Sequence, residues 1–357
     1  MTMIRPYVHN IDPVIGSILG VYLWWYGFFF VAGFLTAHLF LRFRRANLGM
    51  SLRSVYTLSL LLAACVVAGG RLVVVVFYEW PYYREHLAQI LALWIGGMST
   101  HGLLLGGFVA LGLFAWMERR SFLDLTDVIV IPAALIMAFA RLANFVDGQI
   151  VGGITDMPWA VKFPDADGFR HPVVLYDGLK NLLIVPILVA ISHFNPPRGM
   201  QTGIFLLLYA GLRLFVDLFR EYPTTLLGLA TGQVLNMAMA GIGLLLIVVS
   251  CWRGRRSSAQ NNIPAHEYPA VIETPSHWWQ PAAFVLLLAS CLVIPSDWTQ
   301  DVPKRYGKRH AGLMYSIMYP RIESLPKNEQ QDSNSSDSSN HAAPGEGKGG
   351  TVDEGQK

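Results

Sequence analysis

Seven long apolar runs decide what this chain can fold into. They lie at residues 22–41, 55–77, 101–116, 128–145, 174–194, 202–219 and 232–252. Each is close to the roughly 20 residues that a helix needs to cross a bilayer. An eighth, weaker run covers 278–294, and the run 87–95 is short enough to predict an interfacial or re-entrant segment. Since 53% of the 357 residues are hydrophobic and only 14% are charged, we predict an all-α, polytopic transmembrane bundle with seven core helices and an eighth, C-terminal helix.

Composition divides the chain further along its length. We expect a transmembrane core at 1–256, a cytoplasmic linker at 257–276 and the extra transmembrane helix at 277–296. A periplasmic extension would follow at 297–325. Residues 326–357 are rich in Ser, Asn, Gly and Asp and cannot bury enough apolar surface to fold, so they are predicted to form a disordered tail.

Two features bear on targeting and on thiol chemistry. The first apolar run is followed by arginines and lacks a small-residue cleavage site, which is typical of a retained anchor rather than a removed signal peptide. Cys65, Cys251 and Cys291 each lie in an apolar run, and no C-x-x-C or Cys/His spacing links them. This pattern argues against a disulfide framework, a zinc site or a thiol nucleophile.

Arginines alternate between the connecting loops and so predict the orientation. They follow the first, third, fifth and seventh runs: Arg42, Arg44, Arg45 and Arg53, then Arg119 and Arg120, then Arg198, and finally Arg253, Arg255 and Arg256. Loops rich in Lys and Arg remain in the cytoplasm. We therefore expect the amino terminus and the loops 146–171 and 220–231 to face the periplasm of a bacterial inner membrane.

Two arginines near the outer ends of their helices point to an anionic ligand. An arginine near the bilayer centre costs about 2.5 to 3.5 kcal/mol on insertion scales, so Arg141 and Arg213 need an explanation. Guanidinium groups bind phosphate oxygens bidentately. Asn144 follows Arg141 by three residues and Asp217 follows Arg213 by four, so each pair shares a helical face. The alternative is that the arginines only pair with nearby carboxylates or extend to the interface.

Four other polar residues fall in or beside apolar runs. Arg71 is open to either interpretation, whereas Lys180 is expected to pair with Asp177 at i,i+3 spacing. His101 lies in a glycine-rich break, where its imidazole could accept a proton near neutral pH or simply hydrogen-bond between helices. Tyr26 is typical of an interfacial aromatic belt.

Together these residues resemble the signature of the bacterial prolipoprotein diacylglyceryl transferases. The resemblance rests on motifs that occur in the family's order across roughly residues 10 to 255: Trp25-Tyr26-Gly27, Gly70-Arg71-Leu72, Gly96-Gly97-Met98-Ser99 with His101-Gly102, Arg141-Leu142-Ala143-Asn144-Phe145 with Gly148 and Gly152, His171-Pro172 with Leu175-Tyr176, Arg213 with Phe219-Arg220, and Gly232-Gln233.

The resemblance implies that a diacylglyceryl group moves from phosphatidylglycerol to the lipobox cysteine of a prolipoprotein, forming a thioether and releasing glycerol phosphate. It assigns phosphate binding to Arg141 and Arg213, and makes His101 either the base or an organiser of the head-group pocket. It also implies substrate-binding roles for Tyr26, Arg71, Asn144, Gly152 and Asp217. The partners would be phosphatidylglycerol, the signal-peptide and lipobox region, and the bilayer, with no nucleic acid, metal or soluble cofactor.

Several positions depart from the family pattern. They are Leu103, Gln149, Val151, Gly153, Val173, Val174, Asp177 and Asp217. Gln149 removes a charge from the outer loop, where the family has Glu, and Leu103 adds bulk where the family has glycine. A catalytically silent or redirected paralogue that binds lipid or lipoprotein is therefore an alternative, and a membrane transporter is a further one.

Overall fold

The computed structural model describes residues 6–46, 48–220, 225–226, 229–259, 274–296, 306, 309, 310, 312, 313 and 319. Within them, seven helices are long and apolar enough to cross a membrane. They are α1 (Trp25–Arg44), α2 (Leu52–Val73) with its π-helical continuation η1 (Val74–Tyr78), α4 (Thr100–Met117), α5 (Phe122–Val146), α6 (Val173–Ser192), α7 (Met200–Asp217) and α8 (Thr231–Ala259). Each falls on one of the predicted runs, which confirms the polytopic helical bundle.

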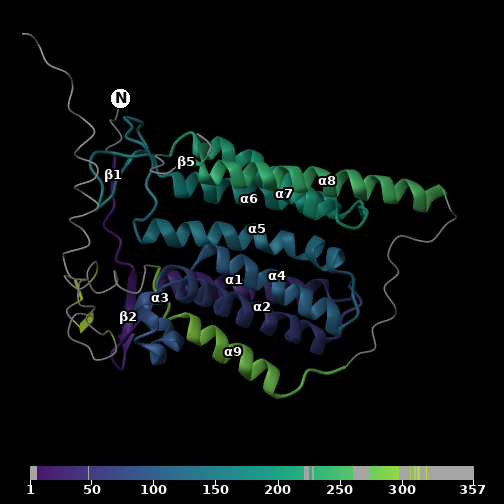
Figure 1. Ribbon diagram of the computed structural model, residues 1–357, viewed down its shortest axis with the longest axis horizontal. Coiled ribbons are helices and arrows are strands. Elements are labelled where there is room, and N and C mark those ends of the chain that lie inside the picture. Colours follow the sequence, from purple (N-terminus) through teal and green to yellow (C-terminus); the bar gives the residue numbers. More distant parts are fainter. Residues whose placement is uncertain are drawn as a thin grey trace, which may run out of the picture. The chain divides into compact units, whose positions relative to one another are not determined.

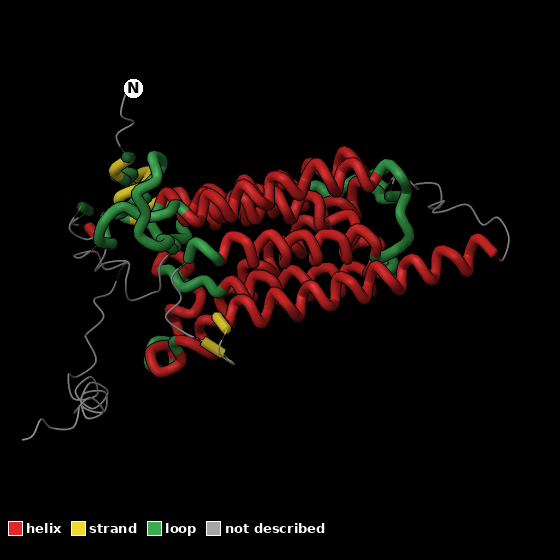
Figure 2. The backbone as a smooth tube through the Cα atoms, turned by 90° about the horizontal axis from the view of Figure 1, so that it is seen from above, coloured by secondary structure: helices red, strands yellow, loops and turns green. Residues whose placement is uncertain are grey.

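The helices pack largely as neighbours in a row. Helix α8 lies on α7, α7 on α6, α6 on α5 and α5 on α1, while α2 contacts both α1 and α4 (Figure 1). Seen from the other direction, the same helices run alongside one another over most of their length (Figure 2). This arrangement brings the carboxyl ends of α5 and α7 and the amino end of α6 to the same end of the bundle.

Short irregular elements gather at that end. Strand β1 (Tyr7–Val8) pairs in parallel with β4 (Val161–Lys162), and two antiparallel pairs are formed by β2 (Val14–Ile18) with β3 (Val21–Trp24) and by β5 (Thr225–Leu226) with β6 (Leu229–Ala230). The predicted short segment 87–95 forms two 3-10 helices, η2 (Leu87–Leu91) and η3 (Leu93–Ile95), after the single turn α3 (Trp80–Tyr83).

Glycines set the close contact between α2 and α4. A Cβ atom on Gly106 would overlap the Cys65 carbonyl oxygen and lie 2.8 Å from the Val66 Cα atom. Gly69 and Gly102 face each other in the same contact, and there too a Cβ atom would overlap backbone. Small residues let two membrane helices approach to backbone distance, where van der Waals packing holds them together.

The eighth predicted helix is present but short. Helix α9 (Trp279–Cys291) has 13 residues and packs on α2 and α1. At 1.5 Å per residue it is roughly 20 Å long, less than a hydrocarbon core of about 30 Å. Phe284, Leu288 and Cys291 are buried in one cluster with residues of α1 and α2. The carbonyl of Leu292, just after α9, accepts the Trp24 N–H at 2.9 Å.

The remaining domain boundaries stay predictions. Most of the expected linker 257–276, most of the extension 297–325 and the whole tail 326–357 lie outside the described residues, as does part of the outer loop 220–231. The few described residues of the extension include Tyr306, Leu313 and Tyr319, which are buried against Trp24 near the start of α1.

The glycine contact gives a stability test. Gly106→Ala is expected to lower the free energy of unfolding by about 1 to 3 kcal/mol, because its methyl group must push α2 and α4 apart. Gly112→Ala in the same helix has no atom within 4 Å of its new Cβ and should be neutral or slightly stabilising. Thermal unfolding of both variants in the same detergent checks this; equal melting temperatures would contradict the packing.

Candidate functional site: a buried charge cluster

Three cationic side chains converge on one buried carboxylate. Asp177 of α6 accepts the Nε–H of Arg141 from α5, with 2.5 Å between Nε and Oδ2. The same oxygen accepts a short contact from Nη1 of Arg213 on α7. Nζ of Lys180, one turn further along α6, lies 3.2 Å from Oδ1. The Asp177 side chain is only 2% exposed, so it joins three helices at one point inside the bundle.

A second set of contacts orients the two arginines. Nε of Arg213 lies 3.0 Å from Oδ1 of Asp217, and Nδ2 of Asn236 on α8 lies 3.5 Å from Oδ2 of the same carboxylate. Nη1 of Arg141 donates to Oδ1 of Asn144 at 3.2 Å. All three contacts predicted from helical spacing, including Lys180 with Asp177, are therefore present.

Counted over the ion pairs seen among the described residues, the cluster carries one positive charge in excess. Three cations, Arg141, Lys180 and Arg213, face two carboxylates, Asp177 and Asp217. Lys180 is stabilised in other ways as well, because its Nζ donates to Oδ1 of Asn181 at 3.0 Å and lies 3.5 Å from the centre of the Tyr209 ring. An uncompensated buried cation is costly, so a bound anion would complete the charge balance.

Exposure shows where such an anion would bind. The Arg141 side chain is 20% exposed and that of Arg213 is 12% exposed, whereas Lys180 and Asp177 are almost completely buried. Arg141 therefore presents the most accessible positive charge. Arg213 lies between two carboxylates and is held in place before any ligand arrives.

Small residues allow the elements around the cluster to meet. Gly178 lies where a Cβ atom would be 3.4 Å from that of Arg141, so α6 approaches α5 closely beside Asp177. Gly152 is enclosed more tightly, since a Cβ atom there would lie 2.6 Å from the Phe219 carbonyl oxygen. Its N–H donates to the carbonyl of His171 at 3.0 Å. Gly152 thus fixes the outer loop onto the ends of α6 and α7.

Within the described residues, Arg71 pairs with backbone carbonyls rather than with a carboxylate. It is buried, and its five N–H groups point to backbone carbonyls of the irregular segment before α4: Ile90, Gln89, Ala92, Gly96 and Gly97. Gly96 and Gly97 both have positive φ angles, of 88° and 80°, as expected for the predicted glycine-rich break. The contacts give Arg71 a scaffold role, and direct substrate binding by it stays a prediction.

His101 and Tyr26 come from two further helices, α4 and α1. His101 is exposed in the first turn of α4 and has no hydrogen-bond or ion-pair partner within the described part of the chain. Tyr26 is partly buried in α1, edge to face with Phe30 at 5.2 Å between ring centres. It packs against the apolar cluster that includes α9.

Sequence reasoning missed two members of the cluster, Tyr209 and Asn236. Tyr209 precedes Arg213 by four residues, so its place on the same helical face was a usable signal. Asn236 comes from another helix, and no local spacing indicates its contact with Asp217. No group of three or more His, Cys, Asp or Glu side chains able to hold a metal ion occurs among the residues that the structure describes.

The fold and this cluster define a multi-pass membrane protein with a buried ion-pair cluster at one end of its helical bundle. The model of the prolipoprotein diacylglyceryl transferase family matches residues 13–249, and the chain belongs to this transferase family. The match confirms the resemblance seen in the motifs.

Curated relatives cover the same region. The chain is 34% identical over 249 residues to the phosphatidylglycerol–prolipoprotein diacylglyceryl transferase of Geobacter sulfurreducens. The aligned region covers 67% of this chain and 95% of that protein. The enzymes of that name from Nitratidesulfovibrio vulgaris and Nitrosomonas europaea are 36% and 35% identical, over 67% and 71% of this chain and 94% and 95% of their own lengths. Helix α9 lies beyond the residues that the family model matches.

The charge balance of the cluster can be tested by substitution. Asp177→Asn should lower the free energy of unfolding by about 3 kcal/mol, because it leaves three buried cations with one carboxylate. Adding Lys180→Met to that variant restores the original charge excess and should recover part of the loss, as measured by thermal unfolding in detergent. Asp156→Asn, an exposed carboxylate in the outer loop, is the control. If Asp177→Asn alone were as stable as the wild-type protein, the ion pairs of the cluster would not contribute to stability.

Proposed function

We propose that this protein transfers the diacylglyceryl group of phosphatidylglycerol to the lipobox cysteine thiol of prolipoproteins, the first step of lipoprotein maturation. Membership of the family supports the reaction class. The observation that carries the proposal is the arginine pair held on Asp177 with one positive charge in excess. A phospholipid phosphate is an anion that such a site suits.

The reaction requires a group that stabilises the departing phosphate. The cysteine sulfur attacks the diacylglyceryl carbon that is bonded to a phosphate oxygen, so a C–S bond forms as the C–O bond breaks. The thiol proton passes to a base and glycerol phosphate leaves with the additional negative charge. Arg141 would meet that charge from its partly exposed position, while Arg213, fixed by Asp177 and Asp217, would hold the phosphate in place.

We further propose that the cluster end of the bundle faces the periplasm of the bacterial inner membrane. The arginine-bearing connections between α1 and α2, α4 and α5, and α6 and α7 all lie at the opposite end, and the positive-inside rule assigns them to the cytoplasm. Phosphatidylglycerol would then enter from the outer leaflet, and the prolipoprotein would present its signal-peptide and lipobox region from the same side.

The redirected or silent paralogue stays the second candidate, because one departure has a structural consequence. Gln149, where the family pattern has Glu, donates from Nε2 to the hydroxyl of Ser296 at 3.1 Å. Ser296 belongs to the segment after α9, which lies outside the family match. This contact ties the outer loop to an element that the family model does not match.

Arg141→Ala is expected to reduce formation of the diacylglyceryl adduct by about 10²- to 10³-fold, since it removes the most accessible positive charge next to the leaving phosphate. Purified protein, phosphatidylglycerol micelles and a lipobox peptide allow the adduct to be measured by mass spectrometry. Arg84→Ala removes an exposed arginine whose side chain is 60% exposed and should leave the rate unchanged.

Two outcomes would decide between the candidates. An adduct that requires both Arg141 and the peptide cysteine would establish the transferase. Wild-type protein that binds phosphatidylglycerol but forms no adduct, while a conventional family member is active in the same micelles, would contradict transfer and favour the silent paralogue.

A separate experiment distinguishes the two roles of His101. If its imidazole is the base, His101→Gln should lower kcat by about 10²- to 10⁴-fold with little change in KM for phosphatidylglycerol. If it only organises the head-group pocket, the same variant should mainly raise KM. Steady-state kinetics with varied phosphatidylglycerol separate these effects, and wild-type values for both constants would exclude either role.

A further inference from the structure

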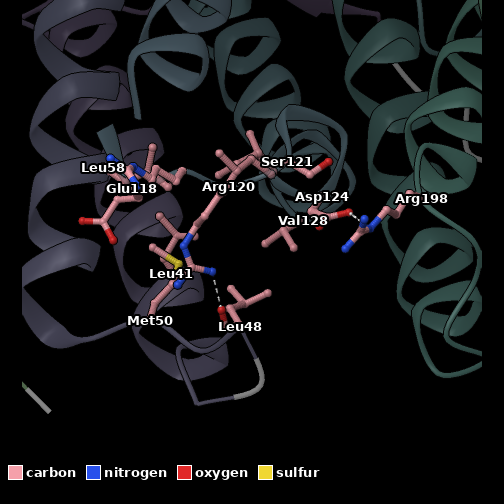
Figure 3. Close-up of a pocket in the computed structure, with 13 residues that line it drawn as sticks. Leu41, Leu48, Met50, Leu58, Glu118, Arg120, Ser121, Asp124, Val128 and Arg198 are labelled. Atoms are coloured by element: carbon pink, nitrogen blue, oxygen red, sulfur yellow. Dashed lines mark hydrogen bonds and ion pairs between the residues drawn. The ribbon is translucent and has the colours of Figure 1, made fainter. Parts of the chain in front are cut away.

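A cavity of about 270 Å³ opens at the arginine-rich end of the bundle, opposite the Asp177 cluster. One wall is apolar and is formed by Leu, Met, Val and Ile side chains of α1, α2, α5 and the loop after α1. The other wall is polar and comes from the connections that follow α4 and α6 and from the first turn of α5, with Arg119, Arg120, Ser121, Asp124 and Arg198 among its residues. Figure 3 labels the last four of these. The cavity is thus amphipathic, as a lipid-like ligand requires.

Two of its arginines are fixed by the protein itself. Arg120 donates to the carbonyl oxygens of Leu48 and Gly49 at 2.6 and 2.5 Å, which closes the α1–α2 loop against the end of α4. Arg198 reaches Asp124 from the other side of the cavity, with 2.9 Å between Nε and Oδ1 (Figure 3). Asp124 is buried. Its contact with Arg198 is made through Nε of the guanidinium group. The Arg198 side chain is still 58% exposed, and its terminal amino groups have no partner within the described residues.

Arg119 occupies a position that favours glycine. It follows the last turn of α4 with a φ angle of 51°, and the next N–H, from Arg120, donates back to the carbonyl of Ala115 at 2.9 Å. This is the helix ending in which glycine normally takes the left-handed conformation. A residue with a Cβ atom costs roughly 1 kcal/mol or more there.

No contact of the Arg119 side chain within the described residues offsets the cost of this backbone conformation. Its side chain has no hydrogen-bond or ion-pair partner in the part of the chain that the structure describes. Backbone strain persists where it serves a function. An arginine placed at a glycine position, beside a cavity and with an unused guanidinium, is consistent with contact to a ligand that is not part of the chain.

We propose that this cavity binds the phosphate group of an anionic amphiphile between Arg119 and Arg198, with an apolar segment against the wall formed by α1, α2 and α5. The lining still carries a net positive charge, because three arginines face two carboxylates. Of these carboxylates, Asp124 pairs with Arg198, and Glu118 accepts a hydrogen bond from Ser54 Oγ at 3.1 Å. The ligand is a lipid headgroup of the leaflet at that end, or a soluble phosphate compound with an apolar part.

This site is separate from the proposed reaction. The cavity lies at the end of the bundle away from Arg141 and Arg213, so the lipid bound there is not the one that reacts. Anionic lipids are attracted to arginines at a membrane surface, but that attraction alone does not depend on one particular arginine. If lipid binding depends on Arg119, the lipid occupies a specific site rather than being held by non-specific electrostatic attraction.

Binding can be measured by native mass spectrometry on the full chain in detergent, with a short-chain phosphatidic acid as probe. The Arg141→Ala background removes binding at the reaction site. Arg119→Gln and Arg198→Gln should each weaken binding about tenfold, through loss of a charge-assisted hydrogen bond. Arg253→Gln removes an exposed arginine of α8 at the same end of the bundle and should have no effect.

A further variant separates binding from folding. Arg119→Gly should also lose affinity about tenfold, yet melt at the same temperature as the parent protein or higher, because glycine relieves the strained backbone. Equal binding by Arg119→Gln and Arg253→Gln would overturn the proposal. So would equal binding of an uncharged short-chain diacylglycerol.

The last arm identifies the source of the phosphate. Inorganic phosphate that competes with phosphatidic acid at similar concentrations would support a soluble phosphate compound as ligand. Competition only by lipids with a charged headgroup would support a lipid of the adjoining leaflet. Binding of either ligand should depend on Arg119. The binding measurement does not require transferase activity, so loss of binding here can be distinguished from a failure of the proposed transfer reaction.

Discussion

The Asp177 carboxylate is the contact on which the functional half of this protein depends. It joins α5, α6 and α7 through Arg141, Lys180 and Arg213, and because Asp177 itself is almost completely buried, an unpaired charge there would be costly. The helices cannot slide past one another without separating these pairs. Among the described residues the same contacts leave one cation in excess, and this excess is the basis of the proposed phosphate site. In that proposal, the residues that fix the helices are also the residues that bind the substrate.

The other half of the bundle is held by different forces. Helices α2 and α4 meet through glycines at backbone distance, where packing rather than charge provides the attraction. Next to them lies the segment 87–97, which forms only short 3-10 turns rather than a continuous helix. Arg71 satisfies five carbonyls of this segment with its own N–H groups, as backbone at membrane depth requires. Its charge is used to support a loop that leads directly to His101.

The C-terminal segment adds a third layer to this arrangement. Helix α9 and the described residues 292–296 after it lie beyond the family match, yet α9 packs against α1 and α2, and Ser296 accepts a hydrogen bond from Gln149 of the outer loop. Gln149 is also a position where the chain departs from the family pattern. The amide of Gln149 donates a hydrogen bond to the Ser296 hydroxyl, which an ionised glutamate at this position could not do. The departure and the added segment are thus connected by one hydrogen bond.

Local periodicity determined much of this protein from its sequence. Apolar runs of bilayer length predicted the seven helices, and adjacent glycines predicted the break before α4. Spacings of three and four residues predicted the pairs of Arg213 with Asp217, Arg141 with Asn144 and Lys180 with Asp177. Only the tertiary structure decided that Asp177 meets Arg141 and Arg213, that Arg71 binds carbonyls, and that α9 is a short packed helix. Those contacts join residues far apart in the chain, and the faces that two helices turn to each other follow from packing, which no local spacing encodes.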